Sequence, residues 1–182
     1  MRVIAGRYKG RRLQSPSWAG LRPTSDRLRE TLFNVLSSRV EGARAIDACA
    51  GTGALGIEAL SRGAAHVTFV ERDRRAVGLV TRNLAACHVT QGYTMMAIAV
   101  ERVPAGSLDG SADLVLVDPP YEAADLVDLV ERVARWLAPG GLLVVEHGAR
   151  RQVPEAVGGL RRVRQLRAGD SCLSLYEAAD QP

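Results

Sequence analysis

The sequence predicts an α/β fold in which helices cover both faces of a mainly parallel β-sheet. Two observations lead to this prediction. From Ala43 onward, short apolar runs typical of buried strands alternate with longer segments of helical periodicity. A glycine-rich turn also follows the first apolar run and opens the first helix of the series. Folds of this class bind ligands at the carboxyl ends of the strands, near the point where the strand order reverses.

The alternating elements can be placed from the periodicity of their apolar residues. We expect parallel strands at residues 45–48, 67–71, 93–99, 112–117 and 141–146, separated by helices at 54–61, 74–86 and 124–137. The segments 160–166 and 171–176 have the pattern of an antiparallel strand pair. Five parallel strands and this pair give a seven-stranded sheet.

A short appendage precedes the sheet. Residues 1–20 alternate weakly around Gly6 and Gly10, which predicts a small basic hairpin, and residues 21–182 form the main domain. Ser25 or Thr24 can cap a helix that runs to about Arg39. The apolar residues of this helix recur on one face: Leu28, Leu32, Val35 and Leu36.

The charge is distributed unevenly between these two parts. Residues 1–44 contain ten Lys or Arg against three Asp or Glu, whereas residues 45–182 contain fourteen against seventeen. A basic arm on a near-neutral domain is expected to contact an anionic partner such as nucleic acid. Basic side chains of the arm can bind phosphates and Tyr8 can stack on a base, although a solvated charged hairpin remains the simpler alternative. The candidate RNA-binding residues are Arg2, Arg7, Tyr8, Lys9, Arg11, Arg12, Arg22 and Arg27.

Cysteine and histidine usage predicts reduced thiols, a cytoplasmic location and no metal. The three cysteines are widely spaced, no Cys-x-x-Cys occurs, and the three histidines lack ligand spacing. Cys49 could act as a nucleophile, but a buried unreactive thiol is the more common state. No run of 18 apolar residues is present, so we expect no membrane span, and nothing in the sequence requires more than a monomer.

The turn after the first strand predicts a nucleoside site. Residues 47–56 read Asp-Ala-Cys-Ala-Gly-Thr-Gly-Ala-Leu-Gly, which contains G-x-G-x-x-G between a strand and a helix. Glu71 ends the next strand, 20 residues after Gly51, where an acid can accept both ribose hydroxyls. A nicotinamide dinucleotide is the usual ligand of this pattern. However, Asp47 would repel its pyrophosphate, whereas a cationic nucleoside such as S-adenosylmethionine would suit this carboxylate.

The fourth strand ends in Asp118-Pro119-Pro120-Tyr121. Two prolines make the backbone stiff where a parallel strand delivers its last residues to the mouth of the sheet. A carboxylate, a carbonyl and a flat ring held there could grip the edge and face of a planar amine. An ordinary strand-ending turn is the alternative, because Asp and Pro are common turn residues.

Together these motifs resemble Rossmann-type methyltransferases that use S-adenosylmethionine and act on exocyclic amines. The segments 2–10 and 22–34 are similar, more specifically, to the RsmD family, which methylates a guanine N2 in bacterial 16S ribosomal RNA. The resemblance covers nearly the whole chain. It implies a Rossmann-like methyltransferase fold and a role in ribosome maturation, with the small subunit or a partly assembled particle as partner.

The resemblance also implies roles for individual residues. Asp118 and the Pro119 carbonyl would hold the guanine amine at the stiff corner that Pro120 completes, and Tyr121 would stack on the base. The residues expected to bind the cofactor are Asp47, Ala50, Gly51, Thr52, Gly53, Gly56, Glu71, Arg72, Met96, Ala97 and Asp118. The segment 95–99 lacks the acid that relatives use to bind the adenine amine, so backbone groups are expected there instead.

Three other functions fit parts of the pattern. The same corner could serve adenine N6 or a protein amide, a non-catalytic RNA-binding assembly factor could retain the fold, and a nicotinamide dehydrogenase is a more distant alternative. For the methyltransferase, we expect deletion of residues 1–20 to impair RNA methylation and to spare cofactor binding.

Overall fold

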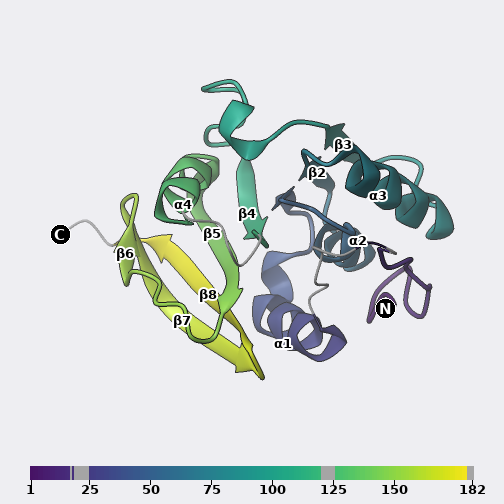
Figure 1. The fold of residues 1–182 in the computed structure, drawn as a ribbon, viewed down its shortest axis with the longest axis horizontal. Helices are drawn as coiled ribbons and strands as arrows, with labels where there is room; N and C mark the ends of the chain where they lie inside the picture. Colours follow the sequence, from purple (N-terminus) through teal and green to yellow (C-terminus); the bar gives the residue numbers. More distant parts are fainter. Residues whose placement is uncertain (17, 19–24, 120–125, 180–182) are drawn as a thin grey trace.

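The computed structural model describes residues 1–16, 18, 25–119 and 126–179. Its core is one eight-stranded sheet with the strand order β3-β2-β1-β4-β5-β8-β7-β6 (Figure 1). The parallel strands are β1 (Arg44–Ala48), β2 (His66–Val70), β3 (Tyr93–Met96), β4 (Ala112–Val117) and β5 (Leu137–Gly148). The strand order reverses at β1, which lies between β2 and β4, so the carboxyl ends of β1 and β4 flank the expected ligand crevice.

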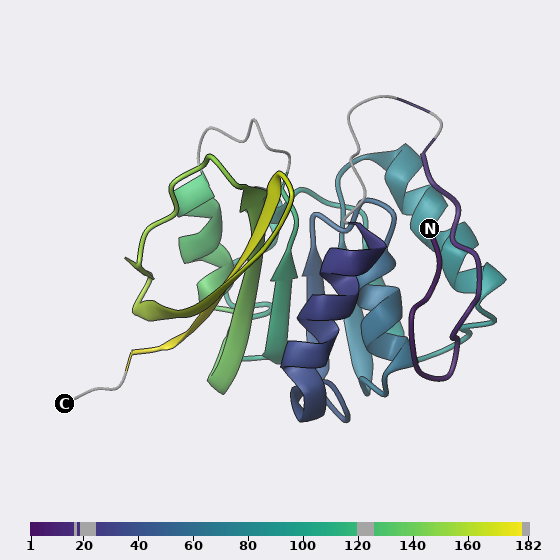
Figure 2. The ribbon, with the colours of Figure 1, turned by 90° about the horizontal axis from the view of Figure 1, so that it is seen from below.

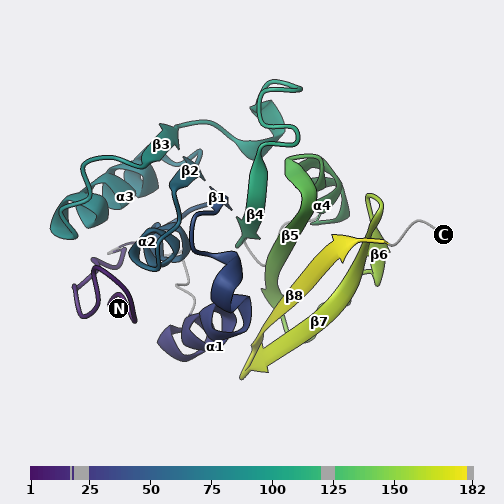
Figure 3. The ribbon, with the colours of Figure 1, turned by 180° about the vertical axis from the view of Figure 1, so that it is seen from behind.

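Three antiparallel strands complete the sheet beyond β5 (Figure 3). They are β6 (Ala156–Val157), β7 (Leu160–Ala168) and β8 (Ser171–Ala178). The predicted fold class is confirmed, with β6 as a strand of only two residues that the sequence did not indicate. His147 at the end of β5 binds the Ser174 hydroxyl of β8 over 2.9 Å, which gives this histidine a structural role.

Helices cover both faces of the sheet. The helices α1 (Asp26–Leu36), α2 (Ala54–Ser61) and α3 (Arg74–Ala86) contribute to one apolar cluster, and α4 (Leu126–Ala134) contributes to the cluster on the other face. Short 3₁₀ turns, η1 (Ser37–Arg39) and η2 (Val100–Arg102), complete the order. In the part of the chain that the structure describes, no helix is long and apolar enough to cross a membrane.

Local sequence explains where these helices begin. The Ser25 hydroxyl caps α1 by accepting from the Leu28 N–H at 3.2 Å, as one of the two predicted caps. The Asp73 carboxylate caps α3 by accepting from the Arg75 N–H at 2.8 Å. The predicted bounds of α2, α3 and β4 are confirmed, whereas β3 ends at Met96 instead of Ala99.

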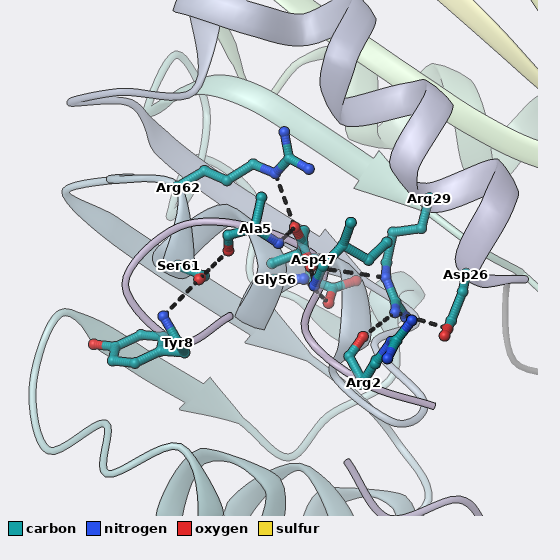
Figure 4. A network of polar contacts seen from close by, with 11 residues as sticks. Arg2, Ala5, Tyr8, Asp26, Arg29, Asp47, Gly56, Ser61 and Arg62 are labelled. Carbon is teal, nitrogen blue, oxygen red and sulfur yellow. Dashed lines mark hydrogen bonds and ion pairs between the residues drawn. The ribbon is translucent and has the colours of Figure 1, made fainter. Parts of the chain in front are cut away.

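The N-terminal arm, residues 1–16, forms a short antiparallel hairpin. Arg2 and Arg12 make an antiparallel bridge, and the N–H groups of Val3 and Leu13 donate to the carbonyls of Arg11 and Met1 at 2.9 and 3.1 Å. The Glu58 side chain of α2 also accepts the N–H groups of Ile4 and Ala5, at 2.8 and 3.0 Å (Figure 4). Gly6 backs directly onto α2, because a Cβ at this position would lie 1.8 Å from the Ser61 carbonyl oxygen.

Arg29 of α1 is not available to bind RNA. Its guanidinium is fully buried between α1 and the arm, where it donates to the Arg2 carbonyl and to Asp26. Its Nε lies 3.9 Å from the buried Glu58 carboxylate, which also accepts from Arg62 at 2.8 Å (Figure 4). This ionic network fixes α1, α2 and the arm to one another.

We expect Glu58→Ala to lower the free energy of unfolding by about 3–5 kcal/mol, because it removes one of the two anions beside the buried Arg29 and the acceptor of two N–H groups of the arm. Glu58→Gln should cost less, since it keeps an acceptor for the arm. Chemical denaturation measures both changes. The control is Glu155→Ala, which removes a carboxylate that is 88 % exposed and should cost less than about 1 kcal/mol. A similar loss for Glu58→Ala and Glu155→Ala would contradict this account of the network.

Candidate active site

The glycine loop connects β1 to α2 through a series of left-handed residues. Cys49, Gly51 and Gly53 have φ angles of 61°, 56° and 75°. The Ala50 N–H donates to the Val70 carbonyl at 3.2 Å, which joins the loop to the end of β2. Because Gly51 and Gly53 lack a Cβ, the loop turns tightly and its backbone stays open to a ligand.

Asp47 lies beneath this loop, at the end of β1, and is only 1 % exposed. Its Oδ2 accepts the Gly56 N–H in the first turn of α2 at 2.8 Å. Burial raises the pKa of the Asp47 carboxyl to about 8, an effect that the Gly56 hydrogen bond opposes and the nearby Glu71 charge reinforces. A cationic ligand beside Asp47 would stabilise its ionised form.

Gly56 lies where α2 packs closely on the sheet. A Cβ on Gly56 would lie 2.3 Å from the Phe69 ring of β2, so glycine is required for α2 to pack on the sheet. Its N–H donates a hydrogen bond to the Asp47 carboxylate. Gly56 therefore supports the loop from below through packing.

Glu71 is held at the mouth of the site by two backbone groups. One oxygen of the carboxylate accepts from the Gly51 N–H at 2.9 Å and the other accepts from the Asp73 N–H at 2.8 Å. Each oxygen retains a lone pair for a second donor, such as a sugar hydroxyl. The Met96 carbonyl accepts the N–H groups of Glu71 and Ile98 at 3.1 and 2.9 Å, so Met96 supports the acid through its backbone.

An open pocket of about 420 Å³ lies beside Glu71, at the carboxyl ends of β2 and β3. Arg72 and Ala97, two of the expected cofactor-binding residues, line it. Ile98 and Ala99, from the segment whose backbone was expected to bind the adenine, line it as well. Two further lining residues, Glu101 and Arg102, were not expected, because they lie beyond the third strand in η2.

Asp118 follows β4 directly, and its N–H donates to the Ala48 carbonyl of β1 at 3.3 Å. The corner thus lies beside the glycine loop, as the strand order requires. Asp118 is half-buried and Pro119 is buried. Pro120, Tyr121 and the RNA candidate Arg22 lie outside the described residues.

Acids from four separate segments influence the thiol of Cys49 in the glycine loop. Burial is the main reason that the pKa of the Cys49 thiol rises to about 12, and the charges of Glu71, Asp118, Glu101 and Asp47 add to this rise. A thiol with such a pKa stays protonated at neutral pH, which argues against Cys49 as a nucleophile. Although the chain has a net charge of +4, this edge of the sheet concentrates negative charge.

Among the described residues, no group of three or more His, Cys, Asp or Glu side chains has the arrangement of a metal site. The acids around the glycine loop form an acidic edge of the sheet. The basic candidates of the arm lie elsewhere on the surface. Arg2, Arg7, Lys9, Arg11 and Arg12 are exposed, as is Arg27 on α1, and Tyr8 is half-buried.

The sequence profile of the family described as Conserved hypothetical protein 95 matches residues 1–177. The chain belongs to this family, the RsmD family of methyltransferases. It is 35% identical to ribosomal RNA small subunit methyltransferase D of Escherichia coli, with 100% of this chain and 91% of the relative covered. The corresponding Haemophilus influenzae protein is 36% identical over 80% of this chain and 78% of its own length.

A solved structure supports the same conclusion. The Escherichia coli protein named "Putative methyltransferase yhhF" superimposes with a TM-score of 0.85 at 34% identity, covering 100% of this chain and 99% of that one. This RsmD-family chain therefore has the arrangement of the methyltransferases from the N-terminal arm to β8. The predicted methyltransferase fold is confirmed.

Proposed function

We propose that this chain transfers a methyl group from S-adenosylmethionine to the exocyclic N2 of one guanine in 16S ribosomal RNA, during maturation of the small subunit. The observation that carries the proposal is the placement of three acids around the glycine loop: Glu71 accepts the Gly51 N–H, Asp47 accepts the Gly56 N–H, and the Asp118 N–H donates to Ala48. We further propose that the chain acts as a monomer in the cytoplasm, on a whole or partly assembled particle.

The site fits this cofactor by the chemistry of its donors and acceptors. The loop from Ala50 to Gly53, together with Asp47, would hold the methionine part. The buried Asp47 carboxylate would then lie beside the positive charge of the cofactor. Glu71 would accept the ribose hydroxyls, and the pocket of Arg72 and Ala97 would hold the adenine. When bound, S-adenosylmethionine supplies an electrophilic methyl group on a sulfonium. A pyrophosphate at the glycine loop would instead face Glu71 and Asp118 and would oppose the ionisation of Asp47, which disfavours a nicotinamide dinucleotide.

Asp118 would prepare the acceptor amine. The lone pair of a guanine N2 is delocalised into the ring, so the planar amine is a poor nucleophile. A carboxylate and the Pro119 carbonyl that accept its two N–H groups would favour the pyramidal form, in which the lone pair is available. Asp118 or water would then take the proton that N2 loses once it has accepted the methyl group. The target base must leave its stack to reach this corner.

We expect Glu101→Gln to raise the KM for S-adenosylmethionine about tenfold, because the acid would accept a hydrogen bond from the adenine amine that an amide accepts less strongly. The kcat should change little. Steady-state kinetics at saturating RNA measure both constants. The control is Asp109→Asn, an exposed acid of the same connection that does not line the pocket. Equal KM values for the two variants would remove Glu101 from the adenine site.

Nucleoside analysis tests the proposed acceptor. Ribosomal RNA methylated by the protein is digested and its nucleosides are identified by mass spectrometry. N2-methylguanosine is the expected product. N6-methyladenosine would show the second candidate amine to be the substrate, and no methylation of any RNA would favour the non-catalytic assembly factor.

A further inference from the structure

Asn83 of α3 connects the N-terminal arm to the glycine loop through one fully buried amide. Its Nδ2 donates to the Thr52 carbonyl at 2.9 Å and to the Gln14 carbonyl at 3.2 Å. Its Oδ1 accepts the Gln14 N–H at 2.7 Å. The loop that would hold the cofactor and the arm that would hold RNA thus share the same side chain.

The arm follows α3 on both sides of this contact (Figure 2). Arg11 donates to the Ala86 carbonyl near the end of α3, and the Gln14 side chain accepts from Arg82 at 3.2 Å. At the start of α3, the Arg75 guanidinium lies 5.1 Å from the centre of the Trp18 ring. Trp18, just beyond the arm, thus contacts the first turn of α3, the helix that follows Glu71.

The arm also binds α2, the helix that begins at the glycine loop. The Ser61 hydroxyl accepts the Tyr8 N–H at 2.9 Å and donates to the Ala5 carbonyl, while the Ser61 carbonyl accepts the Arg7 N–H at 2.7 Å. The two helices that flank the loop are therefore both attached to the arm. If the arm left this position, Asn83 would lose two of its three hydrogen bonds, and the loop would lose its fixed neighbour.

We infer that Asn83 is a positioning residue that couples RNA binding on the arm to cofactor binding in the loop. The docked arm orders the Thr52 region, so the cofactor binds without having to order the loop itself. RNA that holds the arm in place favours the same docked state. By thermodynamic linkage, each ligand must then raise the affinity for the other by the same factor. This inference rests on the proposed function for the identity of the two ligands.

The inference replaces one expectation from the sequence. A freely attached arm could be removed without an effect on cofactor binding, but an arm that shares Asn83 with the loop cannot. Removing the arm's contact with Asn83 should weaken cofactor binding even when no RNA is present.

Two substitutions at one position separate the backbone contact from the side chain. Gln14→Pro removes the N–H that Asn83 accepts, whereas Gln14→Ala keeps this N–H and removes only the exposed side chain. We expect Gln14→Pro to raise the Kd of S-adenosylhomocysteine, measured calorimetrically without RNA, by about 5- to 10-fold, and Gln14→Ala to leave it unchanged. Asn83→Ala should reproduce the effect of Gln14→Pro.

Kinetics distinguish positioning from a general loss of structure. For Gln14→Pro, the KM values for S-adenosylmethionine and for 16S ribosomal RNA should both rise, while kcat at saturation of both stays near that of the parent protein. Unchanged cofactor affinity in both Gln14→Pro and Asn83→Ala would overturn the coupling, and so would equal effects of Gln14→Pro and Gln14→Ala. These binding measurements need no RNA, so they can fail while the parent protein still methylates guanine, and the two proposals are tested separately.

Discussion

Replacing Asp118 by alanine is expected to lower kcat for methyl transfer by about 10³-fold while leaving cofactor affinity nearly intact. The substitution removes the carboxylate that would accept the amine N–H and favour its nucleophilic form. A loss of this size corresponds to about 4 kcal/mol of transition-state stabilisation, which is typical when one polar group that acts on the reacting atoms is removed. Single-turnover methyl transfer with calorimetric cofactor binding separates the two effects.

Two further variants sharpen the Asp118 test. Asp118→Asn keeps the size of the side chain but introduces N–H donors that would oppose those of the amine, so it should be nearly as inactive. Asp113→Asn changes an acid at the opposite end of the same strand, where Asp113 accepts the Arg44 N–H at 2.8 Å. This control should retain activity. Full activity in Asp118→Ala would exclude the proposed role of Asp118 in binding the acceptor amine.

Replacing Asp47 by asparagine is expected to weaken binding of S-adenosylmethionine by at least tenfold and, at the same time, to stabilise the free protein at alkaline pH. Asparagine can still accept the Gly56 N–H, so the packing around the loop is kept. What is lost is a buried charge that has no cation beside it until the cofactor binds. Function and stability should therefore change in opposite directions.

The pH dependence of stability follows from the raised pKa of Asp47. This pKa is about 8 in the folded protein against an ordinary value of 3.8, so the folded state binds the proton more tightly than the unfolded state. The associated stability is fully present below about pH 4 and declines until about pH 8. The side chain of Asp47→Asn does not titrate. The free energy of unfolding of this variant should therefore exceed that of the parent protein most clearly at pH 8–9. We expect a gain of a few kcal/mol, or roughly 5–10 °C in Tm.

Cofactor affinity should show the opposite trend with pH. A cation bound beside Asp47 favours the ionised carboxylate, so binding releases a proton wherever Asp47 is protonated in the free protein. For a pKa of about 8, the affinity should rise about tenfold between pH 7 and pH 9 through this group. Calorimetry in buffers of different ionisation enthalpy measures the released proton. If the cofactor affinity of Asp47→Asn rose with pH as steeply as that of the parent protein, the assignment of this pH dependence to Asp47 would be refuted.

The sequence predicted the elements that have strong local signals. Helices α2 and α3 and strand β4 have clear caps, glycines or continuous apolar runs, and their predicted bounds agree with the structure. The long strand β5 begins at Leu137, earlier than expected, because Leu137 already pairs with Ala112 before an irregularity in the pairing that contains Gly140 and Gly141. Such glycines usually indicate a turn, so local signals could not show the longer strand.

The missed functional residues depend on tertiary contacts. Arg29 follows Leu28 and precedes Phe33 by one helical turn, so its place on the buried face of α1 could have been recognised from spacing alone. The ion pair with Glu58 that makes this burial possible comes from another helix and has no local signal. Similarly, Asn83 resembles any polar residue of an amphipathic helix until the arm and the loop are brought to it by the fold.

The most direct test of the proposed function maps the methyl group that the protein transfers to ribosomal RNA. Small subunits from a strain lacking the gene are incubated with the protein and isotopically labelled S-adenosylmethionine, and the RNA is analysed by nuclease digestion and mass spectrometry. We expect one labelled methyl group on N2 of a single guanine in 16S ribosomal RNA, absent with Asp118→Ala. Label on another base, or no label in the RNA, would contradict the account.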